Sequence, residues 1–183
     1  MKKEEYSIVL DYLPNGYPLE GKMMPVAQAI GESNLILLEL IPRRGISLEI
    51  GERVYIGEGK RDKIYYILGR LKKEKITQIA KEELERFIEK IVKEREKEFV
   101  DFFNESESIN KRIHQIELLP GLGKKYMVEI LKQRSIKKFE SFEDLKKRIH
   151  NLPFPEKAVE KRLLQELTTD ERHNLFTQQM VRN

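Results

Sequence analysis

The first 72 residues consist of short apolar runs separated by turn residues, a pattern that predicts β-structure rather than helix. The runs are rich in β-branched and aromatic residues, and Pro14, Asn15 and Gly16 follow the first of them as a turn. Four or five strands in about 70 residues bury a core only if the sheet curls, so we expect a small OB-like or SH3-like β-barrel. The strand candidates are Tyr6–Leu13 and residues 34–41, 53–57 and 63–71, with a hairpin tip at residues 58–62.

Alternation along these strands indicates which side chains face solvent, because neighbouring residues point to opposite faces of a sheet. Val54 and Ile56 are expected to face the core, and Tyr65 and Tyr66 to divide between core and surface. The alternative is that the tyrosines of this segment only reflect the preference of tyrosine for strands. An exposed tyrosine beside basic side chains could stack a base, as in OB-type single-strand binders, and the candidate residues for this site are Arg53, Tyr55, Lys60 and Arg61.

From residue 77 on, apolar residues recur at spacings of three and four, which is typical of an amphipathic helix. The pattern continues through Phe103, with a polar interruption near Arg95. If unbroken, this helix is about 40 Å long at 1.5 Å per residue. We therefore expect a connecting helix over residues 73–106. Its apolar cluster at residues 99–103 is wider than a stripe and is expected to pack against the next domain, with an exposed protein-binding patch as the alternative.

The segment from Ile116 to Leu131 fits the helix-hairpin-helix pattern, in which a Gly-apolar-Gly turn joins two short helices. Pro120 is expected to end the first helix, because proline offers no amide and restricts the residue before it. Met127 stands where the general pattern has a small alanine, and its flexible side chain is expected to fill the additional space. The positions that match the pattern are Ile116, Leu119, Gly121, Leu122, Gly123, Ile130 and Leu131.

The turn of this hairpin is a candidate phosphate site. Gly121 and Gly123 allow a tight turn and keep side chains away from a ligand, while Leu122 is expected to point back between the helices. The second helix is expected to begin near Lys124 with unsatisfied amides at its positive dipole end, beside the charges of Lys124 and Lys125. The alternative is a plain helical corner, which needs one glycine and no particular residue after it. Two glycines, a leucine and paired lysines favour the phosphate site.

A second helical pair is predicted downstream. Ser141 opens a capping box, residues 151–155 break the helix with two prolines, and residues 156–167 form the next helix. The loop of this pair has no glycine, so we assign it a structural role. A helix turns by 100° per residue, so one of three consecutive basic residues is expected to point away from a common positive face formed by Lys146, Lys147 and Arg148.

The positive charge of the chain is concentrated around the hairpin. Residues 1–72 carry a net charge of +1, residues 73–108 carry −3 and residues 109–167 carry +6, within a total of +4. A charge excess alone is often only a solvated surface. Combined with the hairpin geometry, it indicates a polyanionic partner.

Composition excludes several functions. The chain has no cysteine, so disulfides, thiolate zinc sites and iron–sulfur clusters are excluded. It has no apolar run of membrane-spanning length and no secretory signal at its N-terminus, so we expect a cytoplasmic protein without a membrane partner. His114, His150 and His173 are scattered singly, and Asp144 is better explained as a capping residue than as a catalytic one. We expect no enzymatic activity, no metal and no cofactor.

Residues 50–59, 99–127 and 139–152 together resemble an archaeal family of predicted nucleic-acid-binding proteins of unknown function. The resemblance covers nearly the whole chain. It implies an N-terminal β-barrel, helix-hairpin-helix repeats and an archaeal source, and it implies no known activity.

The expected architecture is α+β with three parts: a barrel over residues 1–72, a connecting helix over 73–106, and an all-α helix-hairpin-helix domain with a C-terminal tail over 107–183. A fragment starting near Glu107 is expected to fold. The expected function is non-enzymatic nucleic-acid binding, with RNA preferred over DNA, because a small barrel beside a hairpin domain suits structured or single-stranded RNA. The alternative is a scaffold that docks ribosomal or RNA-processing proteins.

Overall fold

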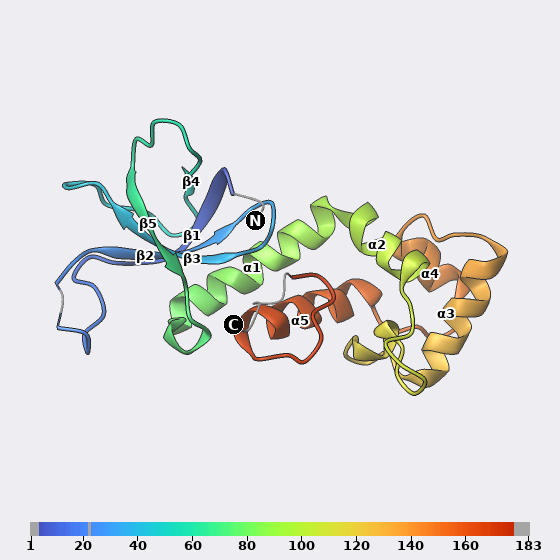
Figure 1. Cartoon of the computed structure of the whole chain (residues 1–183). Helices are drawn as coiled ribbons and strands as arrows, with labels where there is room; N and C mark the ends of the chain where they lie inside the picture. Colours follow the sequence, from blue (N-terminus) through green and yellow to red (C-terminus); the bar gives the residue numbers. More distant parts are fainter. Residues whose placement is uncertain (1–3, 22, 178–183) are drawn as a thin grey trace. The chain divides into compact units, whose positions relative to one another are not determined.

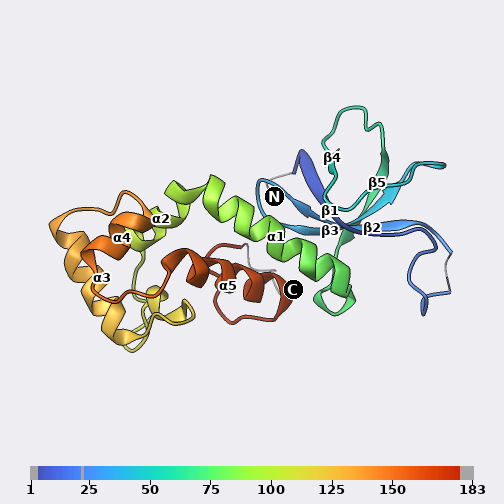
Figure 2. The same ribbon diagram turned by 180° about the vertical axis from the view of Figure 1, so that it is seen from behind.

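The computed structural model describes residues 4–21 and 23–177 and gives a mixed α+β chain (Figure 1 and, from behind, Figure 2). No helix in this part of the chain is long and apolar enough to cross a membrane. The elements of the described residues are β1 (Tyr6–Leu13), β2 (Val26–Gly31), β3 (Leu37–Pro42), β4 (Arg53–Tyr55), β5 (Ile64–Arg70), the 3-10 turn η1 (Lys73–Lys75), α1 (Gln78–Glu94), α2 (Glu96–Glu105), the 3-10 turn η2 (Gln115–Leu118), α3 (Lys124–Ile136), α4 (Phe142–Arg148) and α5 (Pro155–Thr168).

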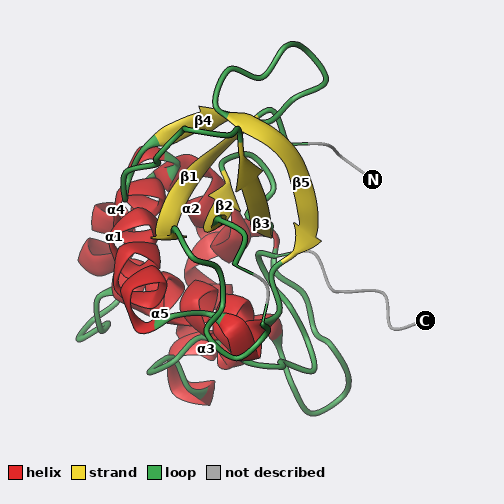
Figure 3. Cartoon of the chain, turned by 90° about the vertical axis from the view of Figure 1, so that its left-hand side faces the viewer, coloured by secondary structure: helices red, strands yellow, loops and turns green. Residues whose placement is uncertain are grey.

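The strands form one antiparallel sheet in the order β4-β1-β2-β3-β5, which curls into a half-barrel (Figure 3). The bounds of β1 are those expected from the sequence. β2 was not among the strand candidates, because all six of its residues are buried and it shows no alternation. The core of the sheet is a cluster of buried aliphatic side chains that includes Val9, Ala27, Ala29, Leu38, Leu40, Val54, Ile56 and Ile64.

The expected hairpin with its tip at residues 58–62 does not form. β4 pairs with β1 and β5 pairs with β3, so these two strands lie at opposite ends of the strand order. A two-stranded hairpin is marginal alone, whereas pairing with β1 and β3 buries Val54 and Ile64 in the shared core. The segment between β4 and β5 is therefore a loop that joins the two edges of the half-barrel.

Two bulges interrupt the alternation of β5. At each of two points β5 advances one residue more than β3, and the additional residues are Tyr65 and Leu68. As a result Tyr65 and Tyr66 are both exposed, at 63% and 36%, and the expectation that they divide between core and surface is wrong. The expectation for β4 is confirmed, since Val54 and Ile56 are buried.

The connecting helix is in pieces rather than continuous. α1 begins where the Thr77 hydroxyl accepts the amide of Ala80 at 3.0 Å and donates to Asp11 at 2.6 Å, which fixes the helix start to the sheet. It ends before Arg95, whose φ of −107° and ψ of 32° are not helical. The next turn of the apolar stripe falls at Arg95 and Glu96, which are charged and half-buried. The helix is therefore divided at the polar interruption that the sequence shows near Arg95, and the unbroken length of about 40 Å is not reached.

The chain divides into two compact units, and the boundary lies within α1. One unit contains the residues up to Arg86 together with those from Glu166 on, and the other contains Phe87–Gln165. In the first unit Lys73 Nζ donates to the Glu166 carbonyl at 2.9 Å. The Glu166 carboxylate accepts the backbone amides of residues 175–177, so the C-terminal segment is held in the same unit as the sheet.

Helix α2 belongs to the core of the second unit. Phe99 and Phe103 are buried, and the Phe103 ring meets the Phe142 ring edge-on at a centroid distance of 6.4 Å. The Asn104 side chain exchanges two hydrogen bonds with the backbone of Phe139, at 2.9 and 2.8 Å. The expectation that the apolar cluster of residues 99–103 packs against other parts of the helical region therefore holds for these side chains.

Candidate nucleic-acid interface

We call residues 119–125 the hairpin loop. Residues 119–123 connect η2 to α3, and Lys124 and Lys125 are the first two residues of α3. Leu119 precedes a proline and has extended backbone angles, φ −77° and ψ 124°, which end η2 as expected from Pro120. Leu122 is 1% exposed, and its amide donates to the Leu119 carbonyl at 3.0 Å. Gly121 has a φ of +85°, a conformation that glycine adopts without strain. The loop is thus held in place by a buried leucine and a left-handed glycine.

Helix α3 begins without a capping side chain. Its N-cap is Gly123, and the helical hydrogen bonds start with the Met127 amide donating to the Gly123 carbonyl at 3.0 Å. The amides of Lys124, Lys125 and Tyr126 therefore have no acceptor within the helix. Both lysines are exposed, and a Cβ added to either loop glycine would meet no atom within 4 Å. Open space, free amides and the positive helix end suit an oxyanion.

The two loop glycines have different roles. Only Gly121 has a positive φ, and Gly123 has φ −76° and ψ −174°, angles that any residue adopts. The expectation that both are needed for the tight turn is therefore wrong for Gly123. Its contribution is the absence of a side chain in front of the first amides of α3.

The element before the loop is a four-residue 3-10 turn and not the expected α-helix. His114 caps it: the His114 Nδ1 accepts the Ile116 amide at 3.2 Å, and the Glu117 carboxylate accepts the His114 amide at 2.9 Å. An α-helix needs a series of hydrogen bonds that each join an amide to the carbonyl four residues earlier. The stretch between this cap and Pro120 is too short for such a series. The hairpin therefore consists of a 3-10 turn, the loop and α3.

The second helical pair adjoins the hairpin. The Tyr126 hydroxyl, in the first turn of α3, donates to the Asn151 carbonyl at 2.7 Å, and Asn151 has a φ of +56°. Lys146 forms ion pairs with Glu143 and Glu156, both at 3.2 Å, and the hydrogen bond that its ammonium donates to the Glu143 carboxylate raises the pKa of Lys146. The positive charge of Lys146 is therefore already balanced by the neighbouring carboxylates.

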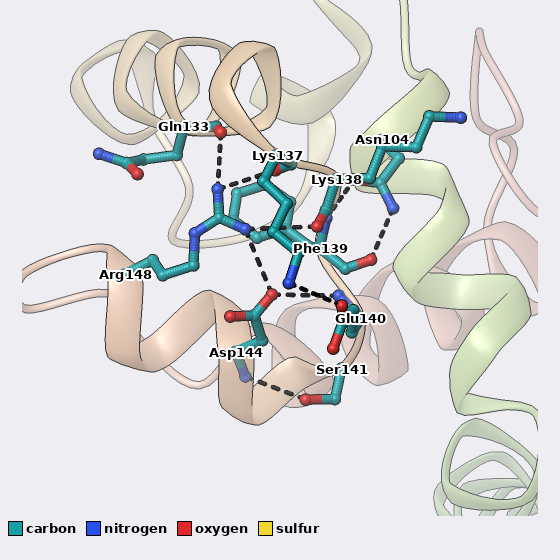
Figure 4. A network of polar contacts seen from close by, with 9 residues as sticks. All are labelled: Asn104, Gln133, Lys137, Lys138, Phe139, Glu140, Ser141, Asp144 and Arg148. Atoms are coloured by element: carbon teal, nitrogen blue, oxygen red, sulfur yellow. Dashed lines mark hydrogen bonds and ion pairs between the residues drawn. The ribbon is translucent and has the colours of Figure 1, made fainter.

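The basic residues at the end of α4 differ in availability. Lys147 is exposed and has no ion pair within the described part of the chain. Arg148, in contrast, is a structural residue, contrary to its predicted place on the positive face. Its guanidinium lies 4.5 Å from the centroid of the Phe139 ring and 3.3 Å from the Asp144 carboxylate. It also donates to backbone carbonyls at the end of α3 (Figure 4), those of Gln133, Lys137 and Lys138.

Ser141 caps α4 as the sequence predicts, since its hydroxyl accepts the Asp144 amide at 3.0 Å (Figure 4). The Oδ2 atom of the Asp144 carboxylate accepts from Arg148 and from the Glu140 amide, the latter at 3.1 Å. Asp144 thus helps to hold the backbone at the start of α4, which agrees with its interpretation as a capping residue.

On the sheet, Arg53 and Tyr55 are engaged with their own neighbours. The Arg53 guanidinium pairs with Glu32 at 2.8 Å and lies 3.4 Å above the centroid of the Tyr6 ring. The hydrogen bond that Arg53 donates to the Glu32 carboxylate is the main cause that raises the pKa of Arg53. The Tyr55 ring meets Tyr6 edge-on at 5.3 Å. Arg53 and the Tyr55 ring are thus both in contact with Tyr6.

The loop after β4 uses the other two predicted residues differently. The Tyr55 hydroxyl accepts the Gly59 amide at 3.0 Å, and the Arg61 side chain donates to the Gly57 carbonyl at 2.7 Å. Lys60 is exposed. The structure therefore does not join Arg53, Tyr55, Lys60 and Arg61 into one open groove, and the exposed tyrosines of the sheet are instead on β5. The exposure of these tyrosines follows from the pairing register of β5 with β3.

The curled antiparallel sheet and the helices that follow it define a mixed α+β protein, and comparisons with known proteins place it in a family. A family profile described as "Protein of unknown function (DUF655)" matches residues 3–178, and the chain belongs to this family. It is similar to "Uncharacterized protein MJ0038" of Methanocaldococcus jannaschii, with 45% identity over 175 residues that cover 96% of this chain and 79% of the relative. The crystal structure of Af1531 from Archaeoglobus fulgidus, of the same family, matches with a TM-score of 0.81 and 44% identity. That match covers 96% of this chain and all of the other.

Proposed function

We propose that this protein binds nucleic acid without converting it chemically, RNA in preference to DNA, through phosphate contacts of the hairpin loop. The observation that carries the proposal is the start of α3, where Gly123 leaves the first amides uncapped and approachable beside exposed Lys124 and Lys125. A purely structural corner needs neither feature. The loop thereby does what the turn of a helix-hairpin-helix does, although a 3-10 turn precedes it.

The charge distribution supports this proposal. Residues 109–167, which contain the hairpin loop, carry a net charge of +6. Phosphates carry no base information, so binding is expected to be weakly sequence-specific and to weaken steeply with salt. The preference for RNA rests on the curled sheet, since small OB-like barrels bind single strands and RNA.

The decisive experiment is the substitution Gly123→Asp. The backbone angles of Gly123 accept any residue, and aspartate at this N-cap would place its carboxylate on the amides that the phosphate needs. We expect α3 to become more stable by a few tenths of a kcal/mol, roughly the gain of aspartate over glycine at an N-cap. Affinity for labelled mixed-sequence RNA, measured by fluorescence anisotropy, should fall about tenfold or more because a charge-assisted contact is replaced by repulsion.

Three charge variants complete the test. Lys124→Glu should weaken binding strongly, whereas Lys161→Glu makes the same charge change at an exposed position on α5 and should have a smaller effect. Lys124→Ala should reduce the slope of log affinity against log salt by about 1. If folded Gly123→Asp and Lys124→Glu proteins bind RNA like the original, the hairpin loop is a structural corner. The scaffold function, with a ribosomal or RNA-processing protein as partner, would then be the better explanation.

A further inference from the structure

Strand β5 is an edge strand of the sheet, and its exposed side chains are unusually apolar. Edge strands are normally protected by charged residues or proline, because exposed apolar edges associate. Here three large apolar side chains are exposed, Tyr65 at 63%, Leu68 at 48% and Tyr66 at 36%, and we call them the β5 apolar edge. Tyr65 and Leu68 are the additional residues of the two bulges, and bulges often re-aim side chains next to functional sites.

The two tyrosine rings are already arranged as a pair. Their centroids are 5.4 Å apart with an interplanar angle of 73°, and both keep ring surface in solvent. A Cβ added to Gly69, which follows Leu68, would meet no atom within 4 Å, so the space directly beside Gly69 is open. Such a surface accepts a flat ring without rearrangement of the backbone.

The positive charge around the β5 apolar edge indicates which class of ligand carries the flat ring. Residues 60–72 contain five lysine and arginine residues against one aspartate, and since Lys63 is paired with Glu52 the local excess is three. Arg43 lies beside the start of β5, since its amide donates to the Lys63 carbonyl at 2.8 Å, and the adjacent Arg44 is exposed. A neutral sugar or an ordinary peptide strand would not use this charge. A chain of bases linked by phosphates uses both the rings and the cations.

We propose that the β5 apolar edge binds single-stranded nucleic acid, with bases stacked on Tyr65 and Tyr66 and phosphates held by the surrounding cations, Arg44 among them. This inference rests on the proposed function and deepens it by naming the form of nucleic acid that the first unit takes. The site differs from the four residues predicted from the sequence, because the bulges of β5 expose tyrosines that alternation alone would have divided between the two faces.

The experiment compares three labelled probes in anisotropy titrations of the full chain: a single-stranded oligonucleotide, an abasic strand of the same length, and a duplex. The variant is the double substitution Tyr65→Ala and Tyr66→Ala, and its matched control is Tyr65→Phe and Tyr66→Phe, which keeps both rings. We expect the alanine variant to lose about tenfold or more in affinity for the single strand, since one stacked base is worth at least several-fold. Its affinity for the abasic strand and for the duplex should stay within about twofold, and the phenylalanine variant should behave like the original.

Each other outcome overturns the inference in a distinguishable way. Equal single-strand affinity of the alanine variant and the original removes the β5 site but leaves the proposed function intact if Lys124→Glu still weakens binding. An equal loss for all three probes, checked against circular dichroism, shows a general change and not base stacking. Absence of binding to every probe by the original chain rejects both proposals. A dimer in sedimentation that the alanine variant abolishes, without any difference in single-strand affinity, assigns the edge to a second copy of the chain instead.

Discussion

His114 shows how one buried side chain fixes the geometry before the hairpin loop. Its Nδ1 accepts the Ile116 amide at 3.2 Å, so the ring must be neutral for this cap to exist. Burial lowers the pKa of His114, and the positive charge of Arg134 lowers it further. Glu117 and a hydrogen bond to the backbone of Ser106 oppose this and do not reverse the direction. The cap is therefore sensitive to acid.

Acid should destabilise the protein through His114. Its pKa in the unfolded chain is about 6.5, and the folded value is lower, so the unfolded chain takes up the proton first as pH falls. The free energy of unfolding should decrease below pH ~6.5, by up to about 1.4 kcal/mol per pH unit, until the folded pKa is reached. Urea denaturation of the original and of His114→Ser, which keeps a cap acceptor without titrating, measures this. Parallel pH profiles for the two proteins would contradict the expectation.

At the scale of elements, a side chain from α4 ends α3. The Arg148 guanidinium donates to the carbonyl of Gln133 at 2.6 Å, which also accepts the Lys137 amide at 3.2 Å, and to the carbonyl of the C-cap residue Lys137 at 2.8 Å. Arginine suits this position because its planar fork reaches several acceptors at once. The basic run at the end of α4 is therefore divided between a structural arginine and a lysine that is free to meet solvent.

Arg148→Ala should lower the free energy of unfolding by about 2 kcal/mol, the value of hydrogen bonds made by a charged donor, with additional loss from the uncovered carbonyls. Arg148→Lys should recover less than half of this, because an ammonium group cannot reproduce the fork. Denaturant titrations followed by circular dichroism measure both. Lys147→Ala is the matched control and should change stability by less than about 0.5 kcal/mol. An Arg148→Ala protein as stable as the original would show that water replaces these bonds.

The elements that the sequence predicts correctly are those set by local chemistry. Tyr6–Leu13 is rich in β-branched and aromatic residues and ends at a turn, and Ser141 caps a helix within its own four residues. Features that depend on distant partners could not be predicted. Val26–Gly31 is buried on both faces and has no period, the exposure of Tyr65 depends on a bulge against β3, and Arg148 meets carbonyls 10 to 15 residues away. The hairpin loop was found because its glycines, proline and lysines are contiguous, whereas the turn before it was mistaken for a helix.

At the scale of the whole molecule, the boundaries of the second unit determine which fragment can fold. α2 supplies buried Phe99 and Phe103 to this unit, and the Glu96 carboxylate accepts the Phe142 amide at 2.8 Å. A fragment that starts near Glu107, as the sequence alone suggests, lacks all three side chains. A fragment of residues 87–165 keeps them.

We therefore expect residues 87–165 to unfold cooperatively and residues 107–165 to remain largely unfolded. Loss of a buried phenylalanine side chain costs about 3–5 kcal/mol, and two such losses approach the whole stability of a small domain. Thermal denaturation followed by circular dichroism distinguishes the two fragments. A cooperative transition in the shorter fragment would show that α2 is dispensable and would restore the boundary near residue 107.

The hydrogen bonds between Lys73 and the chain near Glu166 affect the order in which the two units become complete while the chain is synthesised. The Lys73 ammonium also donates to the Thr169 carbonyl, and the Glu166 carboxylate needs the amides of residues 175–177. During synthesis the strands leave the ribosome before the second unit, yet the segment that completes their unit leaves it after the second unit. The second unit is continuous in sequence and is complete as soon as Gln165 has emerged. The unit that contains the sheet is therefore completed after the second unit. In a nascent chain stalled before Glu166, the sheet lacks the C-terminal segment that belongs to its unit.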